Sequence, residues 1–154
     1  MANKRKKSRV IGKILFVLYI VFLIYFLIFS EWYGREGATQ SYRYNLVLFK
    51  EIRRFWEYRD QLGWYAMFAN IFGNVIVFLP FGYFFPMSCK YRSFFETTFY
   101  SFALSFCVES FQLISKVGSF DVDDILLNTV GGVLGYIIFE VSETIRRRHG
   151  NKKS

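Results

Sequence analysis

The sequence predicts an all-α fold, an integral membrane bundle of four transmembrane helices. Three observations lead to this prediction. Long apolar segments alternate with charged ones, aromatic residues make up 22% of the chain with 20 Phe and 11 Tyr, and basic residues gather at the ends and between the apolar segments. About 20 apolar residues suffice to cross ~30 Å of hydrocarbon, while Tyr and Trp favour the membrane interface. We expect a single domain, residues 1–154.

The first predicted helix covers about residues 10–29 and follows a basic segment, residues 1–9. A basic start before an apolar run is also typical of a secretory signal peptide. We favour an anchored helix because the run is long for a signal peptide and no Ala-x-Ala-like site follows it.

A short amphipathic helix is predicted in the polar stretch that follows, residues 34–63. Apolar side chains recur there at helical spacing with charged residues between them: Leu48, Phe49, Ile52, Phe55 and Trp56. This pattern indicates a helix that lies in the membrane interface. The alternative is a solvated loop helix that packs on the bundle.

Three further helices are predicted at about 64–86, 94–114 and 122–141, and a basic tail follows at 142–154. Orientation follows from the distribution of Lys and Arg. Thirteen of the 20 lie in residues 1–13, the loop at 87–93 and the tail at 142–154, which four crossings put on one side of the membrane. We therefore expect a multi-pass protein with both termini in the cytoplasm.

Polar residues in these helices converge at one depth, near the outer leaflet. With the predicted orientation, three helices carry polar side chains toward their outer ends: Asn70, Asn74, Glu109, Gln112, Asp121, Asp124 and Asn128. An ionisable residue at the centre of a spanning helix costs ~2.5–3.5 kcal/mol on insertion scales, so it usually faces the bundle interior and marks a function. Spacings of three and four residues keep these side chains on one face of each helix. We therefore predict a shared polar cluster that faces outward.

Structural roles are the alternative for several of these residues. Asn74 and Asn128 could form interhelical hydrogen bonds, and Asp121 could cap the last helix. Glu109 is the strongest functional candidate because a carboxylate inside a helix requires a cation or a proton. Three small residues are assigned to helix packing, where they let backbones approach: Gly131, Gly132 and Gly135.

Three kinds of chemistry are open to the cluster. Glu109, Asp121 and Asp124 could hold a divalent cation through oxygen ligands; no other cofactor is indicated. The acids could instead accept hydrogen bonds from a glycopeptide or from a lipid-linked or sugar-linked envelope molecule. Glu109 and Asp124 could also act as acid and base. We expect a non-enzymatic protein, since the sequence offers no nucleophile motif, and no nucleic-acid binding, for which basic flanks alone are weak evidence.

The same residues carry a resemblance to the VanZ-like family of cell-envelope proteins. The run at 70–82, from asparagine to Pro-Phe-Gly, is similar to one motif of that family, and the run at 109–135 is similar to a second. A weaker upstream element at 45–49 has Leu48 where proline is usual. The resemblance covers roughly residues 10–140.

The resemblance implies a small multi-helix protein of the bacterial cytoplasmic membrane, in a family named for a protein linked to teicoplanin resistance. It therefore implies a contribution to glycopeptide tolerance through the outward polar cluster. Two alternatives stay open. One is a small membrane enzyme that acts on a lipid-linked or sugar-linked substrate, and the other is a helix-packing scaffold for other membrane proteins.

Overall fold

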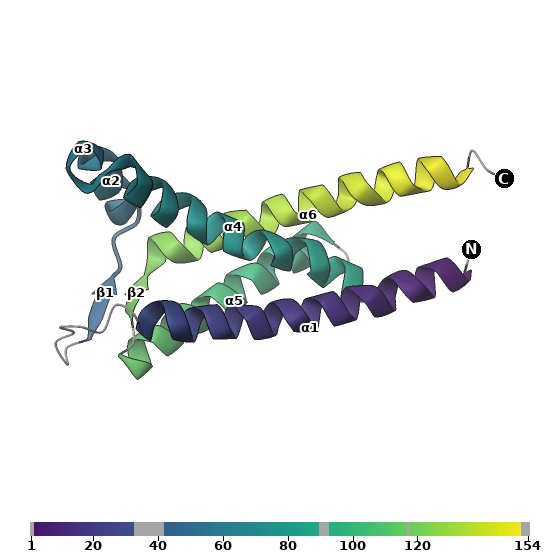
Figure 1. The fold of residues 1–154 in the computed structure, drawn as a ribbon, viewed down its shortest axis with the longest axis horizontal. Coiled ribbons are helices and arrows are strands. Elements are labelled where there is room, and N and C mark those ends of the chain that lie inside the picture. The colour runs from purple at the N-terminus through teal and green to yellow at the C-terminus, as the bar shows by residue number, and fades with distance from the viewer. Residues whose placement is uncertain (1, 33–41, 90–92, 117, 152–154) are drawn as a thin grey trace.

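The computed structural model describes residues 2–32, 42–89, 93–116 and 118–151, and helices dominate them. The elements in chain order are α1 Ala2–Trp32, β1 Arg43–Asn45, α2 Lys50–Glu57, α3 Arg59–Leu62, α4 Trp64–Ser88, α5 Phe94–Ser115, β2 Ser119–Asp121 and α6 Val122–Asn151. The all-α prediction is confirmed. The long helices form an elongated bundle with both chain ends at one end and the strand pair at the other (Figure 1).

All four predicted long helices are present, and their ends extend beyond the predicted ones. α1 includes residues 2–9, and α6 continues to Asn151, so the described parts of the basic tails are helical. α5 begins with a capping box in which the Ser93 side chain accepts the backbone N–H of Glu96, and the Glu96 carboxylate accepts that of Ser93. α4 remains helical through Pro80 and Pro86.

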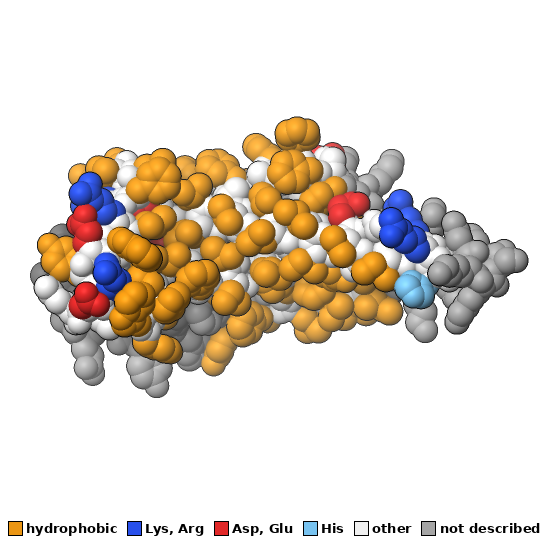
Figure 2. Space-filling view, turned by 90° about the horizontal axis from the view of Figure 1, so that it is seen from above, with side chains coloured by type: hydrophobic (Ala, Val, Ile, Leu, Met, Phe, Trp, Pro, Cys, Tyr) orange, Lys and Arg blue, Asp and Glu red, His pale blue; other side chains and the backbone are white. Residues whose placement is uncertain are grey.

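Two segments of the described chain are long and apolar enough to cross a membrane, Met67–Ser88 in α4 and Val122–His149 in α6. Figure 2 shows hydrophobic side chains over the length of one face, with charged groups near both ends. Apolar side chains elsewhere on the bundle are also exposed, among them Ile14 in α1 and Ile114 in α5. An apolar surface of this extent is typical of a protein that faces lipid. The crossings predicted at 10–29 and 94–114 stay predictions.

α1 packs on α4 through an aromatic core. Tyr19 and Leu23 of α1 are buried against Phe78, Phe81 and Phe85 of α4. The Tyr19 hydroxyl donates a hydrogen bond of 3.0 Å to a backbone carbonyl of α4, at residue 77. Because a buried hydroxyl is costly without a partner, this bond fixes the rotation of α1 relative to α4.

α4 and α6 meet along a line of glycines that we call the glycine seam: Gly82, Gly131, Gly132 and Gly135. A Cβ added to Gly82 would overlap the carbonyl group of Gly132, and one added to Gly131 or Gly135 would overlap an α4 carbonyl oxygen. On the other side of α6, Gly132 contacts Ser101 of α5. Without side chains between them, the two helices approach to backbone contact.

A two-stranded parallel sheet closes the end of the bundle opposite the termini. β1 pairs with β2 in the register Arg43 with Ser119, Tyr44 with Phe120, and Asn45 with Asp121. Neither strand is predicted from the sequence. Their pairing brings the segment before α2 against the turn between α5 and α6, and it positions the functional site.

Candidate functional site

A pocket of about 580 Å³ lies at the strand end of the bundle. Its volume falls in the range of small-molecule sites. Polar side chains from β1, α2, α4, α5, β2 and α6 form most of its wall. The lining residues are Tyr42, Arg43, Tyr44, Asn45, Lys50, Glu51, Arg54, Asn70, Gln112, Ser119, Asp121 and Asp124. We call it the polar pocket.

Asn45 joins the two strands at the pocket wall. Its Nδ2 donates a 3.1 Å hydrogen bond to Oδ1 of Asp121, the residue opposite it in the sheet. Its Oδ1 accepts the backbone N–H of Val47 at 3.2 Å, which turns the chain toward α2. Asn45 is buried, and these two bonds give partners to both the nitrogen and the oxygen of its side-chain amide.

Asp121 caps α6. Its Oδ1 accepts the backbone N–H of Asp123 at 2.8 Å, which is the second residue of the helix. Its own backbone N–H donates to Oε2 of buried Glu109 at 2.9 Å. The sequence suggested a cation or a proton as the partner of Glu109, and the structure gives it a backbone N–H instead. For Asp121, the geometry is that of the helix cap named as its alternative role.

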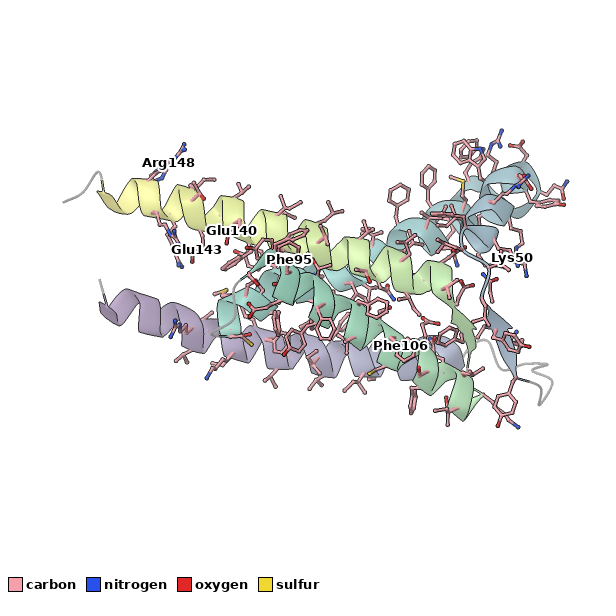
Figure 3. All side chains as sticks on the ribbon, turned by 180° about the vertical axis from the view of Figure 1, so that it is seen from behind. Lys50, Phe95, Phe106, Glu140, Glu143 and Arg148 are labelled. Atoms are coloured by element: carbon pink, nitrogen blue, oxygen red, sulfur yellow. The ribbon has the colours of Figure 1, made fainter. Side chains whose placement is uncertain are left out.

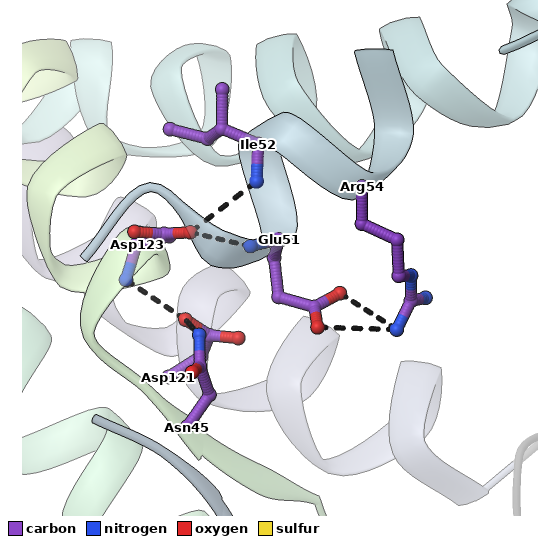
Figure 4. Close-up of polar contacts among 6 residues, drawn as sticks. All are labelled: Asn45, Glu51, Ile52, Arg54, Asp121 and Asp123. Carbon is purple, nitrogen blue, oxygen red and sulfur yellow. Dashed lines mark hydrogen bonds and ion pairs between the residues drawn. The ribbon is translucent and has the colours of Figure 1, made fainter. Parts of the chain in front are cut away.

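Asp123 caps α2 from a distance of more than 70 residues in the chain. Its Oδ1 accepts the N–H of Phe49. Its Oδ2 accepts the N–H groups of Glu51 at 2.8 Å and Ile52 at 3.3 Å, as Figure 4 shows. The side chain is fully buried. The first N–H groups of a helix lack partners within the helix, and Asp123 supplies one carboxylate for three of them.

Phe49, just before α2, has a left-handed backbone with φ 63°. A bulky side chain rarely adopts this conformation, which costs of order 1–3 kcal/mol. The bond from its N–H to Asp123 stabilises the turn and sets the direction in which α2 leaves it. α2 in turn carries Lys50, Glu51 and Arg54 into the pocket wall.

Asn74 and Asn128 form hydrogen bonds between helices, which is the alternative role that the sequence suggested for them. Nδ2 of Asn74 in α4 donates to Oδ1 of Asp124 in α6. Nδ2 of Asn128 donates to Oγ of Ser105 in α5 at 2.9 Å. The first bond supports the pocket wall because Asp124 lines it, whereas the second joins two helices below the pocket.

The structure brings most of the predicted cluster to one end of the bundle but gives its members different surroundings. Asn70, Gln112, Asp121 and Asp124 line the polar pocket. Glu109 does not line the pocket and instead accepts the backbone N–H of Asp121, where β2 passes directly into α6. Part of the predicted cluster therefore lines the pocket, and the rest forms buried hydrogen bonds that support the lining.

The pocket carries charges of both signs. The cations Arg43 and Lys50 come from β1 and α2, and the carboxylates of Asp121 and Asp124 come from β2 and α6. Figure 3 shows Lys50 at this end, with Arg148 at the far end of α6. Glu51 forms a 3.0 Å ion pair with Arg54 within α2. Burial raises the pKa of Asp121, and hydrogen bonds from Asp123 and Asn45 oppose that rise.

The hypothesis of a divalent cation at Glu109, Asp121 and Asp124 gains no support from the geometry. Within the described residues, no group of three or more His, Cys, Asp and Glu side chains is arranged to hold a metal ion. The acids instead bond to backbone N–H groups and to asparagine amides. An oxygen cage for calcium needs six or more converging ligands.

Sequence reasoning missed several pocket residues, above all those on β1 and α2. In the sequence, Asn45 belongs only to the weaker element at 45–49, and Asp123 is not part of the predicted cluster. Both are buried polar residues at the ends of elements, Asn45 at the end of β1 and Asp123 in the first turn of α6. The sequence feature that could have indicated them is a polar residue beside a turn, at a position where the local helix or strand does not need one.

Comparison with known proteins gives two findings. A family model described as VanZ/LLP1 matches residues 16–143. A protein of Enterococcus faecium described as Protein VanZ is 29% identical over 148 residues, which make up 95% of this chain and 81% of that protein. No solved structure matches the chain.

Proposed function

The chain belongs to the VanZ/LLP1 family, and on this basis we propose that it is a four-crossing membrane protein whose polar pocket binds a molecule of the bacterial cell envelope. The binding contributes to tolerance of glycopeptide antibiotics such as teicoplanin. The pocket carries the proposal: about 580 Å³ of space with a mostly polar wall, at the end opposite both termini. A polar cavity at the end of an apolar bundle suits a ligand at the membrane surface.

Orientation follows from charge and architecture together. An even number of crossings returns the chain ends to one side, and both ends lie at one end of the bundle. Arg146, Arg147 and Arg148 stand at that end, as the positive-inside rule requires of the cytoplasmic side. The polar pocket then faces outward, where glycopeptides and cell-wall precursors occur.

α2 and α3 lie at the level of the interface on the outer side of the cytoplasmic membrane. α2 has no buried residue, and its Trp56 side chain is exposed. The guanidinium of Arg59 lies 5.3 Å from the Trp56 ring centroid and 5.6 Å from that of Trp64. Tryptophan and arginine together are typical of headgroup-level anchors, which supports an interfacial helix over a helix packed on the bundle.

Binding has more support than either alternative function. Glu109, one half of the suggested acid–base pair, bonds to a backbone N–H behind the pocket wall. Gly131 and Gly135, the residues of the suggested scaffold face, are buried against α4 of the same chain. These contacts leave the polar pocket as the feature that suits an external ligand.

The proposal is tested by the teicoplanin susceptibility of a sensitive bacterial host. Wild type is compared with empty vector, Asp124→Asn and Asp60→Asn, at membrane levels matched by immunoblot. Asp124→Asn removes a pocket charge but retains Oδ1, which accepts from Asn74. Asp60 is an exposed acid on α3 outside the pocket lining.

We expect wild type and Asp60→Asn to lower susceptibility and Asp124→Asn to lose the effect. If wild type equals the empty vector, the glycopeptide role fails. If Asp124→Asn protects as well as wild type does, the pocket has no part in the role.

A further inference from the structure

The distribution of charge in the polar pocket restricts the chemistry of its ligand. We infer that the pocket takes a lipid headgroup that carries both a phosphate and hydroxyl groups, with the lipid's acyl chains remaining in the outer leaflet. This inference rests on the proposed function, because it requires the pocket to be a binding site. Its basis is the charged side chains that line the pocket and the apolar surface beside them.

Two cations of the pocket lining favour an anion. Arg43 and Lys50 both line the pocket and both are exposed. Within the described part of the chain, neither forms an ion pair with an acid of the protein, in contrast to Arg54, which pairs with Glu51. Two such cations in one pocket attract a phosphate and can form charge-assisted hydrogen bonds with it.

The acidic and amide side chains of the lining disfavour a simple anion. Asp121 of β2 and Asp124 of α6 line the pocket, together with Glu51 and the amide side chains of Asn70 and Gln112. Carboxylates accept hydrogen bonds and repel phosphates, so these side chains favour hydroxyl donors. A ligand that satisfies both the cations and the acids carries an anionic group and hydroxyl groups, as phosphoglycerol and phospho-sugar headgroups do.

The surface beside the pocket indicates that the headgroup belongs to a lipid. Asn45 and Lys50 line the pocket, and the four residues between them are apolar and more than half exposed, with fractions of 64% for Leu46, 62% for Val47, 51% for Leu48 and 55% for Phe49. Four consecutive exposed apolar side chains are costly in water but are stable in an acyl-chain environment. The pocket therefore opens where headgroup and acyl chain meet.

Native mass spectrometry of the purified full chain in detergent tests the inference. Phosphatidylglycerol competes with phosphatidylcholine of the same acyl chains, and sn-glycerol 1-phosphate is the arm without acyl chains. The variants are the double substitution Arg43→Gln with Lys50→Gln and, as matched control, Arg53→Gln. Arg53 lies on the same helix, is highly exposed, pairs with Glu57 and is outside the pocket lining.

We expect wild type and Arg53→Gln to prefer phosphatidylglycerol over phosphatidylcholine by about tenfold, and the double variant to lose this preference, as removal of charge-assisted bonds predicts. An equal loss in Arg53→Gln, or equal binding of the two lipids by wild type, overturns the inference. If glycerol phosphate binds as tightly as the lipid does, the inference of a lipid ligand is wrong, and the ligand is a soluble phosphate ester. Melting temperatures of the variants separate lost binding from lost folding.

The outcome is independent of the susceptibility test. Antibiotic tolerance without a preference for phosphatidylglycerol means that the pocket has a different envelope ligand. A preference for phosphatidylglycerol without tolerance means that the headgroup site exists and that the glycopeptide role is wrong.

Discussion

The glycine seam and the polar pocket use the same pair of helices, α4 and α6, in opposite ways. In the seam, residues without side chains bring the two backbones into contact, and Gly82 lies against Gly132. At the pocket end, the Asn74 and Asp124 side chains bridge the same helices. Backbone contact at the seam holds α4 and α6 rigidly together. At the pocket end, the longer side chains keep the two helices far enough apart to leave a cavity.

The difference shows how a small membrane protein can keep a polar cavity open. In lipid, apolar burial drives helix association only weakly, so close packing and hydrogen bonds supply the stability. The seam concentrates that stability at the level of Gly131 and Gly135. The pocket end can then devote its polar groups to shaping a site.

The largest expected effect comes from filling the seam. Gly82→Ala adds a Cβ that overlaps the Gly132 carbonyl, whereas Gly73→Ala on the same helix adds one with no atom within 4 Å. We expect Gly82→Ala to lower the free energy of unfolding by ~1–3 kcal/mol or more. Gly73→Ala should be neutral or stabilising, since alanine favours helix by about 1 kcal/mol.

Thermal unfolding in detergent, followed by circular dichroism, measures both variants. Equal melting temperatures would show that α4 and α6 can separate without cost, and the contrast between seam and pocket would then fail.

A smaller and more local effect is expected from Asp123→Ala, which removes the carboxylate that accepts the N–H groups of Phe49, Glu51 and Ile52. Loss of a helix cap costs about 0.5–2 kcal/mol. We expect α2 to open locally while the seam keeps the melting temperature nearly constant. Hydrogen exchange should therefore accelerate at residues 49–52 and remain unchanged in the middle of α4.

Asp60→Ala, at an exposed acid on α3, is the control for this experiment. Unchanged exchange at residues 49–52 in Asp123→Ala would contradict the assignment of Asp123 as the cap of α2.

The smallest effect is expected from the charge of Asp121. Its pKa is raised above 3.8 mainly by burial. The native state therefore binds the proton more tightly than the unfolded state, and ionisation of Asp121 lowers stability as pH rises from 3.8 through the folded pKa. Asp121→Asn retains the Oδ1 acceptor for Asn45 and Asp123.

We expect Asp121→Asn to raise the melting temperature slightly at pH 7 and to match wild type at pH 3, where the carboxyl is protonated in both states. Unfolding curves across this pH range, with Asp60→Asn as the exposed control, measure the difference. A lower melting temperature for Asp121→Asn at pH 7 would show that the ionised carboxylate stabilises the α6 N-terminus.

The helices and the family could be predicted from the sequence alone. A helix satisfies its backbone hydrogen bonds within one segment, so apolar runs at 64–86 and 94–114 predicted α4 and α5 to within two residues. The small residues of α6 likewise indicated close packing. The motifs at 70–82 and 109–135 indicated a family that the match at residues 16–143 confirms.

Only the tertiary structure decided how the polar residues divide between site and support. Local spacing assigned Glu109 and Asp124 the same role, but a backbone N–H from β2 holds the first behind the pocket while the second lines it. The contacts of Asn45 with Asp121 and of Asp123 with α2 each join segments more than 70 residues apart. Such bonds form because buried polar groups take whichever partner the packed helices bring near, and no local pattern encodes that choice.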